Sequence, residues 1–165
     1  MADLANNFIE LEEDTQSGRF LTFNLEKEFF GIEIKYVTEI INMMPITSVP
    51  GLPNYIKGII NLRGRIIPVM DIRLRFNMNV LEYNDRTCII VALIDNTDIG
   101  FIVDSVSEVL SIPENDIVDP PEMNKSSNKF IKGIGKVGED IKLLLDYHSL
   151  LSCDDVEVLA NLAGG

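Results

Sequence analysis

The side chains of this chain that could do chemistry are a single histidine, two cysteines and many carboxylates, and their spacing matches no catalytic or metal-binding pattern. His148 belongs to no catalytic motif, although Ser149 follows it directly, and Cys88 and Cys153 stand in no metal-ligand spacing. The sequence contains no P-loop, dinucleotide-binding, nucleophile-elbow or zincin motif. We therefore expect no catalytic residue, no metal ligand and no cofactor, and we interpret His148 as structural or exposed.

Glu39 and Arg63 differ from the other charged residues. Glu39 follows an apolar, strand-like run, and Arg63 lies in the turn-like sequence Asn61-Leu62-Arg63-Gly64. A guanidinium group at a tight glycine turn either pairs with a carboxylate or faces a partner. An ion pair between Glu39 and Arg63 that fixes the turn, and direct contact of Arg63 with a partner, are both open hypotheses.

The net charge of −12 excludes whole classes of partner. Nucleic acids and anionic lipids are bound by clustered lysine and arginine, so this surface should repel both. One stretch is the exception, because five basic residues and a single acidic one, Asp71, lie between Lys57 and Arg75. This stretch is either a solvated face, as most surface charges are, or a contact patch for an acidic partner.

Two parts of the chain repeat, and the repeat defines the elements that must position these residues. The sequence Ile-Lys-Gly-Ile at 56–59 recurs 75 positions later, at 131–134. Residues 31–41 have a similar counterpart 69 positions later, at 100–110. Self-similarity at a nearly fixed offset indicates two copies of one supersecondary unit. Asp71 and Asp146 are equivalent in the two copies, so we expect both to cap short helices rather than to form a catalytic pair.

Short β runs separated by turn residues fill most of the chain. We predict hairpins at 20–34 and 87–103, a strand at 65–70 whose Pro68 requires a sheet edge or a bulge, and an irregular segment at 45–53. Residues 1–18 are acidic, and their pattern indicates a mobile tail or a frayed helix. The apolar face within 153–165 predicts a short C-terminal helix.

The pattern as a whole predicts an all-β protein of two small barrels or sandwiches. The two copies span roughly 19–86 and 87–152. Each half has about sixty residues, which is marginal for independent folding, so the halves should share a hydrophobic core. Two similar halves facing each other would leave a groove between them.

Residues 19–152 resemble the chemotaxis coupling protein family, CheW. The resemblance rests on separate pieces in the right order, above all on the run IKGIINLRGRIIPVMDIRLRF at 56–76, with Phe-Leu-Thr-Phe at 20–23 and Val-Thr-Glu-Ile at 37–40. It implies two SH3-like five-stranded β-barrels around a shared core, and no enzymatic activity. It also implies a cytoplasmic adaptor, recruited to membrane receptor arrays without direct membrane contact, that links chemoreceptors to the histidine kinase CheA.

The resemblance also implies positions for the sites. The receptor tip is expected in the groove between the barrels, at Ile34, Val37, Glu39, Arg63, Val103 and Val106. The regulatory domain of CheA is expected to bind near Met44, Ile46, Thr47, Val49 and Leu52. Gly58 and Gly64 are expected to hold the turn that presents Val37, Glu39 and Arg63.

Other functions stay open on the sequence alone. The chain could serve a related receptor–kinase pathway, such as twitching motility. From another class, a small hydrolase or isomerase would need two convergent carboxylates in a closed pocket. An oligonucleotide-binding barrel is disfavoured by the net charge of −12.

Overall fold

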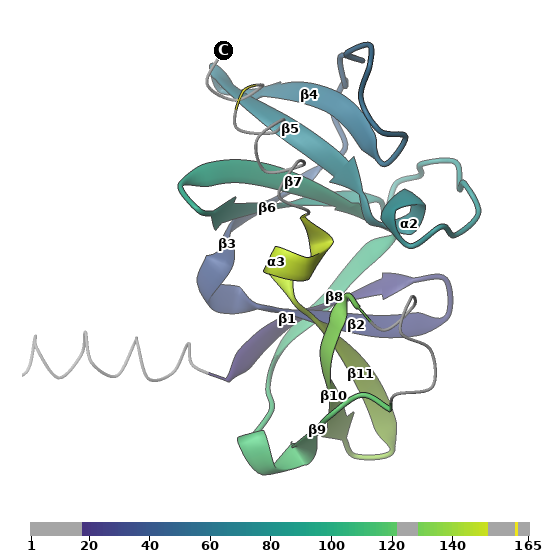
Figure 1. The fold of residues 1–165 in the computed structure, drawn as a ribbon, viewed down its shortest axis with the longest axis vertical. Coiled ribbons are helices and arrows are strands. Elements are labelled where there is room, and N and C mark those ends of the chain that lie inside the picture. Colours follow the sequence, from purple (N-terminus) through teal and green to yellow (C-terminus); the bar gives the residue numbers. More distant parts are fainter. Residues whose placement is uncertain (1–17, 122–128, 152–160, 162–165) are drawn as a thin grey trace, which may run out of the picture.

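The computed structural model describes residues 18–121, 129–151 and 161. Except for Gly18 and Asn161, the expected tail at 1–18 and the expected helix at 153–165 therefore lie outside the described residues. The described part is mostly β-structure, and it forms two sheets that lie one above the other in Figure 1. No helix in this part of the chain is long and apolar enough to cross a membrane.

The first sheet has five strands, and the segment that follows β3 joins its two edges. In spatial order the strands are β3 (Val37–Asn42), β6 (Cys88–Ile94), β7 (Thr97–Val103), β5 (Arg65–Asp71) and β4 (Ile56–Leu62). Thr47 lies beyond β3 and pairs with Ile59 of β4 through two backbone hydrogen bonds of 2.8 and 2.9 Å. Because this contact covers the free edge of β4, the sheet closes toward a barrel.

The second sheet has six strands, one more than the five expected for each barrel. In spatial order they are β8 (Ser105–Ser111), β1 (Arg19–Leu25), β2 (Glu28–Glu33), β11 (Asp140–Leu145), β10 (Ile131–Val137) and β9 (Ile117–Val118). The additional strand, β9, has two residues and is joined to β8 by the 3-10 helix η2 (Glu114–Asp116). The chain after β8 thus closes this sheet in the same way as the chain after β3 closes the other.

Each sheet takes strands from both halves of the sequence. The first-half strand β3 pairs with β6 of the second half, and the second-half strand β8 pairs with β1 of the first half. Parallel pairing of β5 with β7 and of β11 with β2 also joins strands from different halves of the sequence. The sequence halves 19–86 and 87–152 therefore do not coincide with the two barrels, which corrects the expected division of the domain.

The internal repeat is visible in the order of elements. Each copy contains a hairpin, a single strand (β3 or β8), a second hairpin and a one-turn helix, either α2 (Ile72–Arg75) or α3 (Tyr147–Leu150). The expected caps are confirmed: Asp71 Oδ1 accepts a hydrogen bond from Arg73 N at 2.9 Å, and Asp146 Oδ1 accepts one from His148 N at 3.0 Å. Each carboxylate thus satisfies a backbone donor that the helix leaves unpaired.

The strand around Pro68 is not an edge strand, because β5 lies between β7 and β4. Its pairing with β7 begins only at Val69, so Pro68, which has no N–H to donate, falls just before that ladder.

One hydrophobic core spans both sheets, as expected. Its buried members include Phe23 and Phe30 of the six-stranded sheet and Met70, Ile90 and Phe101 of the five-stranded sheet. The α3 helix lies between the sheets in Figure 1 and adds Tyr147 and Leu150 to this core. Burial of about 25 cal/mol for each Å² of apolar surface makes this shared core the main force that holds the barrels together.

Candidate functional site

Glu39 and Arg63 form an ion pair across the opening of the five-stranded barrel. Glu39 lies on β3 and Arg63 in the β4–β5 turn, which belong to opposite edges of the sheet. Both Glu39 carboxylate oxygens accept hydrogen bonds from Arg63 Nη2, at 2.6 and 2.7 Å. Arg65 Nη2 lies 3.6 Å from Glu39 Oε2, and Arg65 Nη1 donates to Asp98 at 3.0 Å. Glu39 is therefore held between two arginines.

The β4–β5 turn explains how Arg63 is presented. Arg63 and Gly64 have φ values of 52° and 87°, which is the pattern of a type I′ hairpin turn. The Arg63 side chain is 69% exposed, and Asn61 Oδ1 accepts a hydrogen bond from Gly64 N at 2.8 Å. Gly64 lies in this turn, whereas Gly58 does not. Gly58 lies inside β4 at a bulge, so its expected place in the turn is wrong.

Four of the candidate groove residues lie on the two segments where the chain crosses from one sheet to the other. Ile34 belongs to the 3-10 helix η1 (Ile34–Tyr36), and Val37 begins β3 at the first crossover. Their equivalents in the repeat, Val103 and Val106, lie at the second crossover. Ile34, Val37 and Val106 are half-buried against the core. Val103 is only 1% exposed, so its placement in a partner-binding groove is wrong, because its side chain belongs to the core.

A cavity of about 520 Å³ opens between the two sheets, but none of the six candidate groove residues lines it. One wall is α2 with the residues that follow it, and the other is formed by β2, β10 and β11. The lining residues are Phe30, Asn54, Tyr55, Leu74, Arg75, Phe76, Asn77, Lys129, Phe130, Ile131 and Leu143. Among the described residues, this lining contains aromatic rings and two cations but no carboxylate.

The Arg75 guanidinium organises this cavity. It lies over the Tyr55 ring at 4.5 Å and the Phe130 ring at 4.8 Å, and its Nε donates to Leu150 O at 2.8 Å. Neither Tyr55 nor Phe130 was among the residues predicted from the sequence to form a site. The repeat contained the signal, because Tyr55 and Phe130 are the equivalent residues just before the two Ile-Lys-Gly-Ile sequences.

The segment expected to meet the kinase lies along the outside of the five-stranded barrel. Met44 and Ile46 pack partly against the core of that barrel, and Leu52 packs against the central core. Val49 is half-buried, and Thr47 is exposed and makes the bridge to β4.

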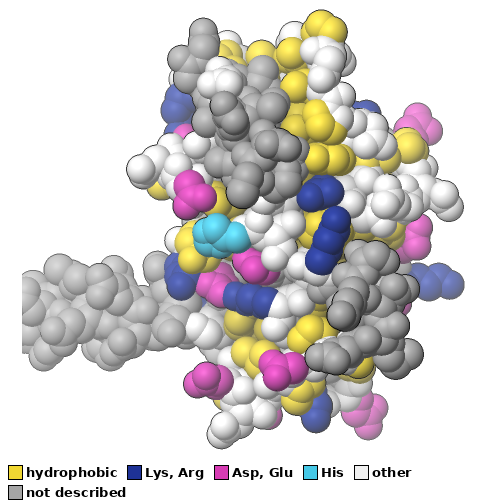
Figure 2. Space-filling view, in the orientation of Figure 1, with side chains coloured by type: hydrophobic (Ala, Val, Ile, Leu, Met, Phe, Trp, Pro, Cys, Tyr) yellow, Lys and Arg dark blue, Asp and Glu magenta, His cyan; other side chains and the backbone are white. Residues whose placement is uncertain are grey.

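The basic stretch between Lys57 and Arg75 is not a free patch for an acidic partner. Arg63 and Arg65 pair with Glu39 and Asp98. Arg73 is buried and pairs with Asp104. Figure 2 shows acidic and basic side chains interspersed on the face it displays, rather than a region of one sign. Neither interpretation left open by the sequence describes Arg73, which is an internal structural residue.

His148 lies on α3, and its side chain is 63% exposed. Its ring nitrogens lie 3.9 Å from Asp95 and 3.6 Å from Asp146. Among the described residues, no group of three or more histidine, cysteine or acidic side chains could hold a metal ion.

Comparison with known proteins gives this arrangement a family. The CheW-like domain matches residues 19–154, which cover both sheets, the ion pair and the cavity. The chain belongs to the CheW-like domain family. It is similar along nearly its whole length to the chemotaxis protein CheW of Klebsiella aerogenes, with 35% identity over 164 residues, 99% of this chain and 98% of the relative.

Other CheW proteins give the same result. The chemotaxis protein CheW of Bacillus subtilis is 31% identical over 134 residues, which cover 81% of this chain and 86% of the relative. The crystal structure of the scaffolding protein TtCheW from Thermoanaerobacter tengcongensis matches with a TM-score of 0.77 and 35% identity, covering 84% of this chain and 94% of that chain. The two sheets are thus the SH3-like β-subdomains of a CheW fold.

Proposed function

We propose that the chain is a non-enzymatic adaptor that couples transmembrane chemoreceptors to the histidine kinase CheA in chemotaxis signalling. The observation that carries the proposal is the match to chemotaxis CheW proteins along nearly the full length of the chain. The structure adds physical support. The described residues include an exposed, oriented ion pair and a cavity between the two barrels.

The receptor contact is proposed at the crossovers and the ion pair. Ile34, Val37 and Val106 are apolar and half-buried, as expected of side chains that can pack against a helix laid into a groove. Glu39 and Arg63 lie at the rim of the five-stranded barrel, where charges fix orientation and select partners more than they add affinity.

The kinase contact is proposed at the outer segment that contains Met44, Ile46, Thr47, Val49 and Leu52. Its apolar side chains are only partly covered, and methionine adapts well to a partner surface. Separate surfaces for the two partners would let one molecule bind both at once, so that weak single contacts add up in an array.

Recruitment to the membrane is proposed to occur through the receptors. The net charge of −12 opposes direct binding to anionic lipid, and it also opposes binding to nucleic acid.

The substitution Arg63→Gly tests the receptor contact with little change to the fold. Gly138 occupies the equivalent turn position in the second copy with a φ of 61°, so glycine suits this backbone. We expect the affinity for a receptor cytoplasmic fragment, and receptor-stimulated kinase activity, to fall about tenfold, or about 1.4 kcal/mol.

The matched control is Lys136→Gln, which removes one exposed positive charge from the equivalent hairpin of the other barrel. It should leave both measurements unchanged. If Arg63→Gly binds the receptor fragment and activates the kinase like the wild type, Arg63 is not part of the contact. If the wild-type protein itself binds neither partner, the adaptor function is wrong.

A further inference from the structure

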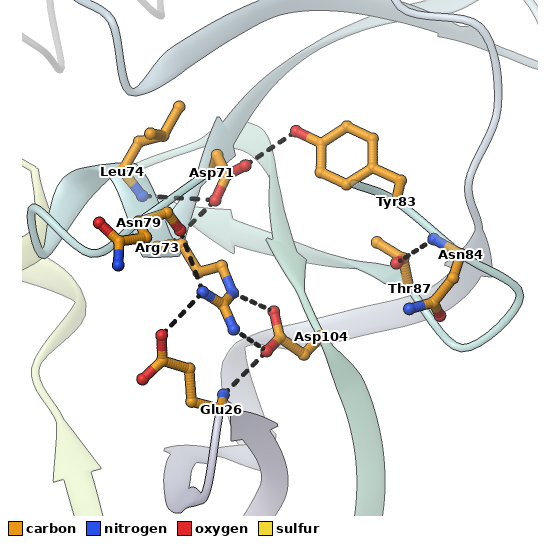
Figure 3. Close-up of polar contacts among 9 residues, drawn as sticks. All are labelled: Glu26, Asp71, Arg73, Leu74, Asn79, Tyr83, Asn84, Thr87 and Asp104. Atoms are coloured by element: carbon orange, nitrogen blue, oxygen red, sulfur yellow. Dashed lines mark hydrogen bonds and ion pairs between the residues drawn. The ribbon is translucent and has the colours of Figure 1, made fainter. Parts of the chain in front are cut away.

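A buried ionic network centred on Arg73 joins the two barrels (Figure 3). Arg73 donates from Nε to Asp104 Oδ1 at 2.6 Å and from Nη2 to Asp104 Oδ2 at 2.7 Å. Its Nη1 donates to Glu26 Oε1 at 3.2 Å and to Asn79 O at 3.0 Å. The Arg73 side chain is 7% exposed and that of Asp104 is 18% exposed. We call these contacts of Arg73 with Asp104, Glu26 and Asn79 the Arg73 clamp.

The clamp bridges the two sheets rather than stabilising one of them. Arg73 lies on α2, directly after β5 of the five-stranded sheet, and Glu26 lies in the β1–β2 turn of the six-stranded sheet. Asp104 lies between β7 and β8, at the second crossover. Glu26 N donates to Asp104 Oδ2 at 2.8 Å, and Asp104 N donates to Asn24 O at 3.2 Å. A continuous path of hydrogen bonds therefore runs from one barrel to the other through Asp104.

The second copy of the repeat provides an internal control for the clamp. The residues at the equivalent positions in the other copy are His148 for Arg73, Lys35 for Asp104 and Asp95 for Glu26. Exposed His148 lies 3.9 Å from Asp95, and Lys35 pairs instead with its neighbour Glu33 at 3.2 Å. The α3 helix nevertheless forms and is capped by Asp146. The repeated unit thus folds without an arginine at this position, so the clamp serves one particular side of the junction between the barrels.

The clamp also fixes the surfaces that face the space between the barrels. The four residues after Arg73, at 74–77, all line the cavity, whose opposite wall belongs to the six-stranded sheet. Asp104 is two residues from Val106 on the second crossover. A two-pronged contact between a planar guanidinium and a carboxylate fixes direction as well as distance. Any change in the angle between the sheets would have to break that contact.

We propose that Arg73 is a positioning residue, which sets the relative orientation of the two barrels and thereby the relative position of the crossovers that carry the proposed receptor contact. Arg73 is too buried to contact a partner itself. The receptor part of this inference rests on the proposed adaptor function, whereas the orientation of the barrels does not.

The test uses Arg73→Met combined with Asp104→Asn. This pair of substitutions removes both charges with little change in volume, so no unpaired charge remains buried. Spin labels are attached to cysteines introduced by Asn42→Cys and Lys136→Cys, at one exposed residue on each sheet. Electron–electron double resonance then reports the distance between the barrels. The labels are placed in a background with Cys88→Ser and Cys153→Ser. Affinities for a receptor cytoplasmic fragment and for the regulatory domain of the kinase are measured on the full-length unlabelled variant.

We expect the distance distribution to shift or broaden and the receptor affinity to fall at least fivefold, while the kinase affinity stays within twofold. Lys132→Gln is the control, because it removes an ion pair with Glu33 inside the six-stranded sheet and should change none of these quantities. An unchanged distance distribution, or an equal loss of both affinities, would overturn the inference. If the wild type binds no receptor, the adaptor function fails, and the distance measurement alone then decides whether Arg73 orients the barrels.

Discussion

Asp71 shows how much a single buried carboxylate does in this fold. It is 5% exposed, accepts hydrogen bonds from two backbone N–H groups of α2, and accepts a third from the Tyr83 hydroxyl at 2.8 Å. Figure 3 shows the tyrosine reaching back to it from the loop after α2. Its equivalent Asp146 accepts from His148 N and Ser149 Oγ, and its side chain is 39% exposed.

The first prediction follows from this difference in burial. Asp71→Ala should lower the free energy of unfolding by about 2–3 kcal/mol, because it removes a helix cap and leaves the Tyr83 hydroxyl without its acceptor. Asp146→Ala should cost about 1 kcal/mol, the value of a partly exposed cap. Urea unfolding followed by circular dichroism measures both. Equal losses would mean that the contact with Tyr83 adds nothing to stability.

The second prediction concerns alkaline pH. Burial raises the pKa of Tyr147 above its ordinary value of 10.0, and burial together with the hydrogen bond to Asp71 raises the pKa of Tyr83. Above pH 10 the unfolded chain therefore loses phenolic protons that the folded chain keeps. Each of the two tyrosines then lowers the unfolding free energy by up to about 1.4 kcal/mol per pH unit.

Tyr147→Phe isolates one of these contributions. It removes the hydroxyl that donates to Glu33 O at 3.0 Å, so the variant should be less stable at pH 8 and its stability should fall less steeply above pH 10. Burial lowers the pKa of Lys132, which acts in the opposite direction just below pH 10.5, but equally in both proteins. Parallel pH curves for the variant and the wild type would contradict the prediction.

Residue types predicted some of the site and not the rest. The Glu39–Arg63 pair could be predicted because a turn sequence and a single carboxylate suggested it. The Arg73 clamp could not be predicted from the sequence. Arg73 lies in a run of basic residues that looks like a solvated surface, and its partner Asp104 is 31 residues away. Val103 and Val106 have identical side chains, and only their places on two different strands make one a core residue and the other half-buried.

At the scale of elements, β4 contains a glycine, Gly58, at a position where the neighbouring chain leaves no space for a side chain. Gly58 has a φ of 145°, and a Cβ atom there would collide with the carbonyl group of Thr47. The bulge that contains it lets the segment after β3 run close against β4 and close the barrel. Gly64 also has a positive φ, of 87°, but no atom outside its chain neighbours lies within 4 Å of its Cβ position.

The third prediction compares these two glycines. Gly64→Ala should cost about 1 kcal/mol, the strain of a positive φ alone. Gly58→Ala should cost at least about 3 kcal/mol, because the strained φ is combined with a backbone collision that no side chain can relieve. The midpoint of urea unfolding measures both. Similar losses at the two positions would show that segment 44–52 moves freely and does not close the barrel.

Local patterns predicted the elements well and their partners poorly. Alternating apolar residues and turn residues located both predicted hairpins, which the structure confirms as β1–β2 and β6–β7. The spacing of Val37, Ile40 and Ile41 is compatible with a helix or a strand, and the structure has η1 followed by β3. The exchange of β3 and β8 between barrels could not be predicted, because either strand could satisfy its hydrogen bonds on the sheet of its own half.

At the scale of the whole molecule, the exchanged strands make the two barrels one folding unit. A barrel built only from residues 19–86 would lack β6 and β7, which lie in the middle of the five-stranded sheet. A barrel built only from 87–152 would lack β1 and β2, which are central to the six-stranded sheet. The central core also takes residues from both sheets. Because the sheets share this core, we expect the two barrels of the intact chain to unfold together.

The fourth prediction tests this interdependence in two ways. Calorimetry of the whole chain should show one transition, with equal van't Hoff and calorimetric enthalpies. The separate fragments 1–86 and 87–165 should each lack the sharp near-ultraviolet signal of packed aromatic rings, because each leaves unpaired strand edges and half of a core. Mixed at equal concentration, the two fragments should associate and regain that signal, since together they supply every strand of both sheets.

A pair cut inside the β10–β11 turn, 1–138 and 139–165, is the control for the position of the cut, because its longer fragment contains the complete five-stranded sheet. That fragment should keep part of the aromatic signal when alone. A fragment 1–86 that folds by itself, or two separated transitions in the whole chain, would show that the strand exchange does not couple the barrels.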